Sequence, residues 1–362
     1  MCGASFSPRL FNGRLKSSMS GLSQLDFACR TRYNFFIALS YVYLYIFNHD
    51  LHQDLPMEKR PLRKEIKYAA LYWFVRFLIF SANLLPRKLW LSFCGFLGRV
   101  AYRFSPKPAA RMITHLTIAF GNEKSSEEIK QLSKRTFVML GRNAGDILRS
   151  LSVKTLSDLE KFLETHGLEN YEKAYAKGKG VMFLTSHLGA FDLQITNMAL
   201  RGLKPNIIGT ALSDPKLNEL LVQYRNAHGA IAIERGRESV RLFKALKSGG
   251  SIAILIDQDT KVKSRFVNFF GKPASTPVGA TVLALKSGCA VVPTYIFLDE
   301  NLKQQMHILP EIPLVYTGDD EQDLIINTQN FTKVTEDIVR QHPEQWVWMH
   351  ERWKTKPGEE IV

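Results

Sequence analysis

The sequence lacks the features that mark a zinc protein, a disulfide-bonded domain or a repeat array. Its 362 residues include only four cysteines, which lie far apart and share no metal-ligand spacing. It also has no internal repeat and no low-complexity segment. We therefore expect a globular protein of a reducing, cytosol-facing compartment, without a structural metal ion.

Acidic residues are under-represented relative to basic ones. The chain has 48 Lys and Arg against 34 Asp and Glu, a formal net charge of +14. This excess favours an anionic partner, either nucleic acid or acidic lipid headgroups. In the first third of the chain, aromatic and aliphatic runs are flanked by Lys and Arg, a pattern that suits a membrane surface better than a nucleic acid. We therefore expect the anionic partner to be a membrane and not a nucleic acid.

Long uninterrupted apolar runs are also scarce. Residues 33–47 are apolar but shorter than the roughly 20 residues that a spanning helix needs. Residues 66–86 are long enough but contain Lys67 and Arg76, and an arginine at a bilayer centre is costly. A tilted or interfacial helix with a snorkelling Arg76 is therefore at least as good an interpretation as a full span. With residues 89–104, this segment predicts a pair of membrane-docking helices.

Composition divides the chain into three parts. Residues 1–56 are expected to form a poorly ordered extension. Alternatively, translation starts at Met57, where a basic leader precedes the first helix, and residues 1–56 are then not part of the native protein. Residues 57–108 form the membrane-associated helical region, and residues 109–362 have the composition of a folded domain. Ser125 and Glu128 have capping-box spacing before an amphipathic helix over 125–148.

The domain from residue 109 onwards alternates short β-branched runs with helical stretches. Continuous apolar strands between helices predict an α/β fold whose sheet is covered by helices on both faces. The expected strands lie in GVMFLTS, PNIIGTAL, AIAIERG, SIAILIDQD and AVVPTYIFL, and the expected helices cover 189–201, 214–228, 238–248 and 278–287.

His187 and Asp192 form the first candidate site. His187 follows a predicted strand directly, and Asp192 falls in the first or second turn of the next helix. Ligands of α/β proteins gather at the carboxyl ends of strands, and a histidine held by a carboxylate is suited to removing a proton from a hydroxyl. The same spacing also fits a helix-capping aspartate beside an incidental histidine, so it does not decide the role alone.

Later stretches add charged residues at two further strand ends. Arg235 and Arg237 follow one predicted strand, and Asp257 and Asp259 end the next. The segments FFGKPASTPVGATVLALKSGCAVVP and HPEQWVWMHERWKTKP come after them. This ordered series, over residues 66 to 357, resembles the lysophospholipid acyltransferase superfamily and, within it, the lauroyl/myristoyl acyltransferases of lipid A biosynthesis.

The resemblance implies a central mixed sheet flanked by helices, as in glycerolipid acyltransferases, with 109–362 as the catalytic domain. It implies an inner-membrane enzyme, with its catalytic domain on the cytoplasmic side. This enzyme would move an acyl chain from an acyl carrier protein or coenzyme A thioester to a hydroxyl of an anionic lipid A precursor. That chemistry requires no metal and no cofactor.

The resemblance also implies roles for individual residues. His187 would be the general base and Asp192 its orienting partner. Arg235 would contact an anionic part of a substrate, while Asp257 and Asp259 would bind or position rather than ligate a metal. Arg237 is a further substrate-binding candidate, although it fits a solvated helix start equally well.

Alternatives stay open at this point. The acceptor could be a lysophospholipid or another glycolipid. A thioesterase or lipid hydrolase would need a nucleophile, yet the sequence has neither a Gly-X-Ser-X-Gly elbow nor a cysteine next to a histidine. A non-catalytic membrane-binding protein is the third possibility. Trp346, Trp348 and Trp353 favour core packing over a binding platform, and His350 and Arg352 receive no role.

Overall fold

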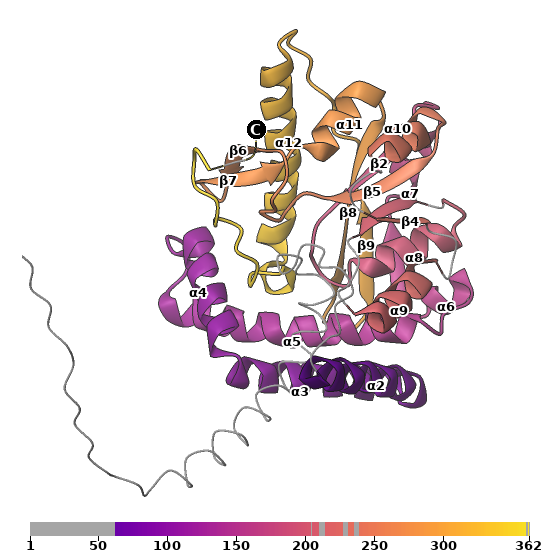
Figure 1. Cartoon of the computed structure of the whole chain (residues 1–362), viewed down its shortest axis with the longest axis vertical. Helices are drawn as coiled ribbons and strands as arrows, with labels where there is room; N and C mark the ends of the chain where they lie inside the picture. Colours follow the sequence, from indigo (N-terminus) through magenta and orange to yellow (C-terminus); the bar gives the residue numbers. More distant parts are fainter. Residues whose placement is uncertain are drawn as a thin grey trace, which may run out of the picture.

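The computed structural model describes residues 62–203, 205–209, 214–226, 231–234, 239–359 and 361. Within them, an N-terminal group of helices precedes an α/β body (Figure 1). The N-terminal helices are α2 (Leu62–Leu84), α3 (Arg87–Phe104), α4 (Pro106–Phe120) and α5 (Ser126–Ser150). The extension at 1–56 and the candidate start at Met57 lie outside this part of the chain.

The body alternates strands and helices, as the sequence predicts. Its helices are α6 (Leu156–Glu160), α7 (Leu168–Tyr175), α8 (Asp192–Leu200), α9 (Pro215–Asn226), α10 (Ser239–Lys247), α11 (Gly279–Ser287) and α12 (Asp320–Gln341). Its strands are β1 (Leu163–His166), β2 (Val181–Thr185), β3 (Asn206–Gly209), β4 (Ile231–Glu234), β5 (Ser251–Leu255), β6 (Ser264–Phe269), β7 (Lys272–Pro277), β8 (Ala290–Leu298) and β9 (Gln304–Ile308).

The central sheet is mixed, with the strand order β1-β9-β8-β2-β5-β3-β4. Every neighbouring pair is parallel except β8 and β9, which are antiparallel. β6 and β7 form a separate antiparallel hairpin. The expected α/β class and mixed sheet are confirmed.

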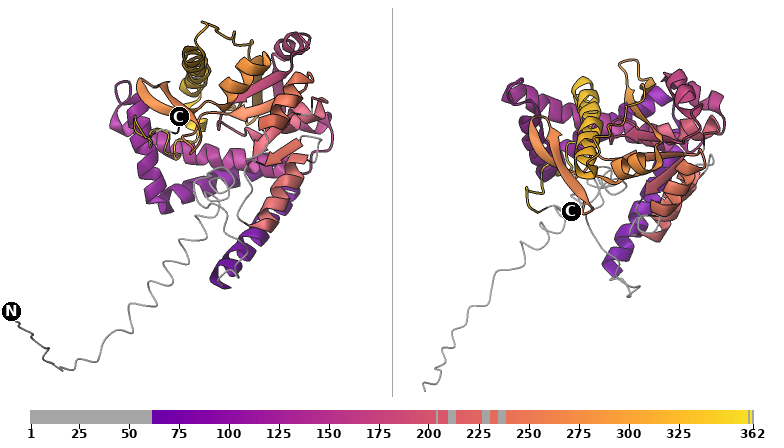
Figure 2. Two further views of the ribbon diagram at one scale, coloured as in Figure 1. Left: turned by 45° about the horizontal axis from the view of Figure 1, so that its top comes forward. Right: turned by 90° about the horizontal axis from the view of Figure 1, so that it is seen from above.

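Helices cover the sheet on both faces, because side chains of a strand point alternately to opposite sides. On β2, Val181 and Phe183 belong to the larger apolar core, which also contains residues of α4, α5, α7 and α8. Met182 and Leu184 belong to a second core, formed with residues of α10, α11 and α12. Helix α12 contributes to both cores, through Phe331 to the second and through Ile338 and Val339 to the larger one. Figures 1 and 2 show how the helices surround the sheet.

Helix α5 connects the N-terminal helices to the body. Its N-terminus has the predicted capping box, in which the Ser125 side chain accepts from the Glu128 amide and the Glu128 side chain accepts from the Ser125 amide. Glycines permit a close crossing with α3: a Cβ at Gly98 would lie 2.2 Å from the Phe137 carbonyl oxygen, and one at Gly141 would lie 2.3 Å from the Cys94 oxygen. Further along the crossing, Arg87 forms an ion pair with the buried carboxylate of Asp146.

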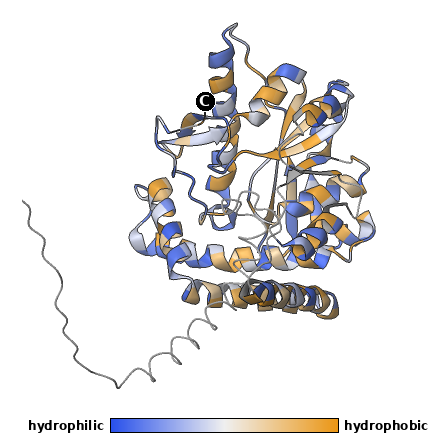
Figure 3. Ribbon diagram, in the orientation of Figure 1, coloured by the Kyte–Doolittle hydropathy of each residue, from blue (hydrophilic) through white to orange (hydrophobic). Residues whose placement is uncertain are grey.

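Helices α2 and α3 expose large apolar side chains on one side each. On α2 the spacing of three, four or seven residues places all of them on a single face. We call this surface, together with its counterpart on α3, the apolar stripe; Figure 3 shows the hydrophobic character of both helices. Its residues are Leu62, Ile66, Trp73, Phe77, Phe80 and Leu84 on α2, and Leu89, Phe93, Phe96 and Phe104 on α3.

None of the helices in the described part of the chain combines the length and the hydropathy that a bilayer crossing requires. Arg76, which interrupts the apolar run in the sequence, is exposed on α2. On its other side, α2 packs through Val75 against Leu217 of α9.

Candidate active site

His187 lies on the turn that follows β2, as expected from the sequence. β2 and β5 are parallel and pair from Val181 with Ser251 to Thr185 with Leu255, a constant offset of 70 residues. His187 and Asp257 continue this register two residues beyond the strands. The carboxyl ends of β2 and β5 therefore bring these two side chains together.

His187 is bonded to Asp257 through both its ring and its backbone. Its Nδ1 lies 2.7 Å from Asp257 Oδ1, and its backbone amide donates to Asp257 Oδ2 at 2.8 Å. Because an ionised carboxylate only accepts hydrogen bonds, the ring carries its proton on Nδ1, which leaves the Nε2 lone pair available. The His187 side chain is 14% exposed, whereas that of Asp257 is fully buried.

Asp257 stays ionised in spite of its burial. Burial raises the pKa of this carboxyl, but the positive charge that His187 has when protonated, together with hydrogen bonds from His187 and Trp346, outweighs the effect of burial and lowers the pKa to about 2. The Trp346 indole Nε1 donates to Asp257 Oδ2 at 2.8 Å. Asp257 is therefore an anion at neutral pH, with partners on both oxygens.

The segment 345–355 holds the two loops that carry this pair. The Val347 amide donates to the His187 carbonyl oxygen at 3.2 Å, and the Gly189 amide donates to the Gln345 carbonyl oxygen at 2.9 Å. Leu188 and Trp346 form an isolated antiparallel bridge. The chain after α12 is thus bonded directly to the turn that contains His187.

Asp259 serves the same segment. Its carboxylate accepts from the amide and the hydroxyl of Thr355, both at 2.8 Å, and its own amide donates to His350 Nε2 at 2.9 Å. Burial lowers the pKa of His350 to about 3, helped by the charge that His187 has when protonated and by the charge of Arg352, so His350 is a neutral acceptor. Asp257 and Asp259 are both buried, and both carboxylates accept hydrogen bonds from within the protein.

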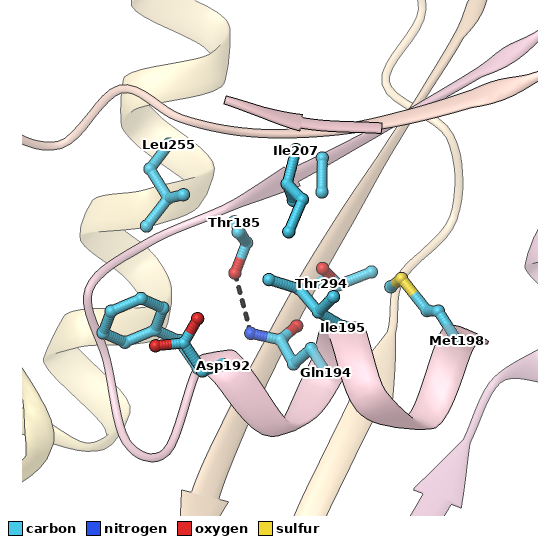
Figure 4. Close-up of a pocket in the computed structure, with 10 residues that line it drawn as sticks. Thr185, Asp192, Gln194, Ile195, Met198, Ile207, Leu255 and Thr294 are labelled. Carbon is cyan, nitrogen blue, oxygen red and sulfur yellow. Dashed lines mark hydrogen bonds between the residues drawn. The ribbon is translucent and has the colours of Figure 1, made fainter. Parts of the chain in front are cut away.

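Asp192 lies at the start of α8, as predicted, but its place differs from the one that the motif implies. It is 1% exposed and lines a cavity of about 30 Å³ between α8 and the sheet, beside Phe191, Gln194 and Thr185 (Figure 4). The Phe191 ring packs edge-on against the His187 ring, with centroids 5.0 Å apart. The partner of His187 Nδ1 is Asp257, so the structure pairs the histidine with a different carboxylate from the expected one.

The remaining sequence candidates divide between the described and the undescribed parts. Arg235 and Arg237 lie outside the described residues, so their substrate-binding roles remain predictions. Across the described ranges, no group of histidines, cysteines and carboxylates is arranged to hold a metal ion. Burial raises the thiol pKa of both Cys94 and Cys289, which makes these two described cysteines poor nucleophiles.

Trp346 and Trp348 are buried and Trp353 is partly buried against the same core, as core packing predicts. Arg352, which received no role, is buried as well. Sequence reasoning missed the second role of Trp346, the hydrogen bond to Asp257. The offset of 70 between GVMFLTSH and SIAILID could have paired His187 with Asp257, but only with the knowledge that these two strands are neighbours. The indole hydrogen bond has no signal in the sequence.

Fold and site together define an α/β protein with a histidine and a buried carboxylate at the ends of adjacent parallel strands, an arrangement suited to withdrawing a proton from a hydroxyl. The sequence model of the bacterial lipid A biosynthesis acyltransferases matches residues 57–355. The chain belongs to this family of acyltransferases, which confirms the family resemblance of the motifs.

Individual relatives agree with this assignment at modest identity. The lipid A biosynthesis palmitoleoyltransferase of Escherichia coli is 29% identical over 207 residues, which span 56% of this chain and 64% of that protein. The lauroyltransferase of the same organism is 26% identical over 274 residues, 73% of this chain and 84% of the relative. A lipid A biosynthesis acyltransferase of Haemophilus influenzae is 26% identical over 300 residues, with 80% and 91% covered.

Proposed function

We propose that the protein transfers a fatty acyl chain from a thioester of acyl carrier protein or coenzyme A to a hydroxyl of a lipid A precursor. The observation that carries this proposal is His187, whose Nδ1 is bonded to a buried carboxylate at the carboxyl end of the sheet. The family and the names of its relatives supply the acyl group and the acceptor class.

In this mechanism the acceptor hydroxyl gives its proton to His187 Nε2 as its oxygen attacks the thioester carbonyl carbon. The resulting imidazolium is stabilised by the anionic Asp257 on Nδ1. When the tetrahedral intermediate collapses, the carbon–sulfur bond breaks and the thiolate takes the proton from Nε2. The reaction forms the ester and the free thiol and regenerates the neutral histidine. It needs no acyl-enzyme, in keeping with the burial of Cys94 and Cys289.

Asp192 and the two arginines retain subordinate roles in the proposal. Asp192 is buried beside Phe191, which contacts the His187 ring, so its carboxyl group lies behind the wall of the site. Arg235 and Arg237 follow β4 in the chain, and β4 belongs to the same parallel part of the sheet as β2 and β5. We assign them to the anionic groups of donor or acceptor, since guanidinium groups bind phosphate with two hydrogen bonds.

The apolar stripe is proposed to bind the cytoplasmic face of the inner membrane, where the acceptor lipid resides. Its aromatic and aliphatic side chains are 40 to 72% exposed. Exposed cations, including Arg76, Lys88, Arg99 and Arg103, lie on the same two helices. Apolar side chains flanked by cations are typical of helices that lie in the headgroup region of an anionic bilayer.

The function is tested with purified protein, a labelled acyl-carrier-protein or coenzyme A thioester, and a tetra-acylated lipid A precursor. The wild type should add one acyl mass to the precursor, and His187→Ala should lower the rate at least 100-fold. His166→Ala is the matched control: His166 is a half-buried histidine of the same sheet, on β1, and its loss should change the rate less than twofold.

Parallel reactions with a lysophospholipid and with a glycolipid acceptor distinguish the acceptor class. If transfer to either of these acceptors is faster than transfer to the lipid A precursor, that acceptor replaces the precursor in the proposal, and the proposed chemistry is unchanged. Release of free fatty acid without ester formation would point to a hydrolase. Equal transfer by wild type and His187→Ala would refute the proposed mechanism.

A further inference from the structure

The buried carboxylate of Asp257 makes hydrogen bonds that the spacing of His187 and Asp192 in the sequence does not predict. One oxygen accepts from the His187 ring, and the other accepts from both the His187 amide and the Trp346 indole. Three hydrogen bonds fix the carboxylate in a single orientation, and two of them come from the residue that it orients. Such a carboxylate can hold the imidazole in one tautomer and one rotamer.

Trp346 connects this carboxylate to the C-terminal segment. The indole is 1% exposed and packs against the rings of Phe269 and Trp348. The neighbouring backbone bonds at Val347 and Gln345 anchor the same segment to the His187 turn. The position of the indole nitrogen is therefore determined from two directions, by aromatic packing and by main-chain hydrogen bonds.

We propose that Asp257 and Trp346 are positioning residues for His187: the indole orients the carboxylate, and the carboxylate holds the ring in the Nδ1-protonated tautomer with Nε2 facing the substrate. This inference builds on the proposed acyl transfer, but the tautomer can be measured without any transfer. The Asp192 carboxylate is the competing candidate, because the spacing of the motif points to it.

The first experiment reads the tautomer directly. Protein labelled with ¹⁵N-histidine is studied by NMR at neutral pH, and the His187 signals are assigned by their loss in His187→Gln. The wild type should show the Nδ1-protonated form. Asp257→Asn should lose that form as the majority species, whereas Asp192→Asn should retain it. Retention in Asp257→Asn, or its loss in Asp192→Asn, would overturn the proposal.

The second experiment compares two tryptophans. Trp346 and Trp90 are both fully buried, and each donates one hydrogen bond, Trp346 to Asp257 and Trp90 to the Gly145 carbonyl oxygen. Trp346→Phe and Trp90→Phe therefore remove the same volume and one hydrogen bond each, so they should lower the melting temperature similarly. Only Trp346→Phe changes the surroundings of the His187 carboxylate.

The kinetic expectation follows from this difference. Trp346→Phe should lower kcat about 3- to 10-fold with the KM of the donor within twofold, and Trp90→Phe, on α3 and away from His187, should leave both within twofold. Asp257→Asn should lower kcat at least 100-fold, again with little change in KM. Equal effects of the two tryptophan variants on kcat would show that Trp346 acts only through packing.

The two proposals fail in different ways. If the wild type shows the expected tautomer but transfers no acyl group to any acceptor, the acyl-transfer proposal falls and the positioning proposal survives. If transfer depends on His187 but Asp257→Asn leaves the tautomer and kcat unchanged, the positioning proposal falls alone.

Discussion

The crossing of α3 and α5 permits a sharp prediction, because it depends on the absence of one methyl group. In Gly98→Ala, the new Cβ would lie 2.2 Å from the Phe137 carbonyl oxygen and 2.9 Å from its carbonyl carbon. Both atoms belong to the backbone of α5, so no side chain can rotate away. Non-bonded heavy atoms prefer about 3.5 to 4.0 Å, so the helices must separate by on the order of 1 Å.

Two effects oppose each other in this variant. Alanine favours a helix over glycine by up to about 1 kcal/mol. Separating the helices loosens the contacts of the buried residues Trp90, Leu91 and Cys94, and overpacking of this kind costs about 1–3 kcal/mol or more. The backbone clash should dominate, and we expect a net loss of about 2 kcal/mol in the free energy of unfolding.

The assay is thermal and urea unfolding of the purified protein. A loss of about 2 kcal/mol should lower Tm by roughly 2–4 °C for a protein of this size. Gly279→Ala is the matched control: it is the first residue of α11, and a Cβ there would meet no atom within 4 Å, so its stability should be unchanged or slightly higher. A Gly98→Ala protein as stable as the wild type would refute the close crossing.

Three further predictions concern pH, the membrane and a helix cap. Burial lowers the pKa of His342 to about 4 from its ordinary 6.5. Below pH 6.5 the unfolded chain therefore binds a proton at His342 that the folded chain does not bind. The free energy of unfolding should therefore fall from pH 6.5 towards pH 4. Between pH 7 and pH 5, His342→Phe should lose roughly 1 kcal/mol less of it than the wild type, as measured by urea unfolding. The same pH slope in both proteins would contradict this. The double variant Trp73→Ser with Phe77→Ser should bind anionic vesicles at least 10-fold more weakly in a sedimentation assay. Tyr316 is about as exposed but lies outside α2 and α3, so Tyr316→Ser should have no effect. Equal binding by the wild type and both variants would show that the apolar stripe does not contact the membrane. Ser125→Ala should cost about 1 kcal/mol and Ser126→Ala, one residue into α5, almost nothing, and equal Tm values would argue against the capping box.

The sequence predicted the parts of this protein that depend on local signals. The capping box at Ser125 and Glu128 lies where its spacing placed it, because both partners are three residues apart in the chain. The turn after β2 and the helical position of Asp192 follow equally from a short apolar run followed by a segment with helical character. Helices α10 and α11 begin and end within one residue of the expected ranges.

The parts that depend on pairing between distant segments could not be predicted. The short strands β1 and β9 form one edge of the sheet but lack a distinctive apolar alternation. The neighbourhood of β2 and β5 is equally invisible, because β3 and β4 lie between them in the chain. The sequence placed Asp257 at a strand end but could not show that this strand lies next to His187.

The place of Trp346 in the chain has a consequence for how the site matures. A polypeptide is synthesised from its N-terminus, and its early segments can begin to fold before later ones exist. Every strand of the sheet precedes Trp346, so His187 and Asp257 can meet while the indole is still missing. Docking of the segment 345–355 then completes the set of hydrogen bonds around the base. On the proposed roles, a nascent chain would carry a histidine that is paired but not yet fully oriented, and full activity would arise only after the segment 345–355 has docked.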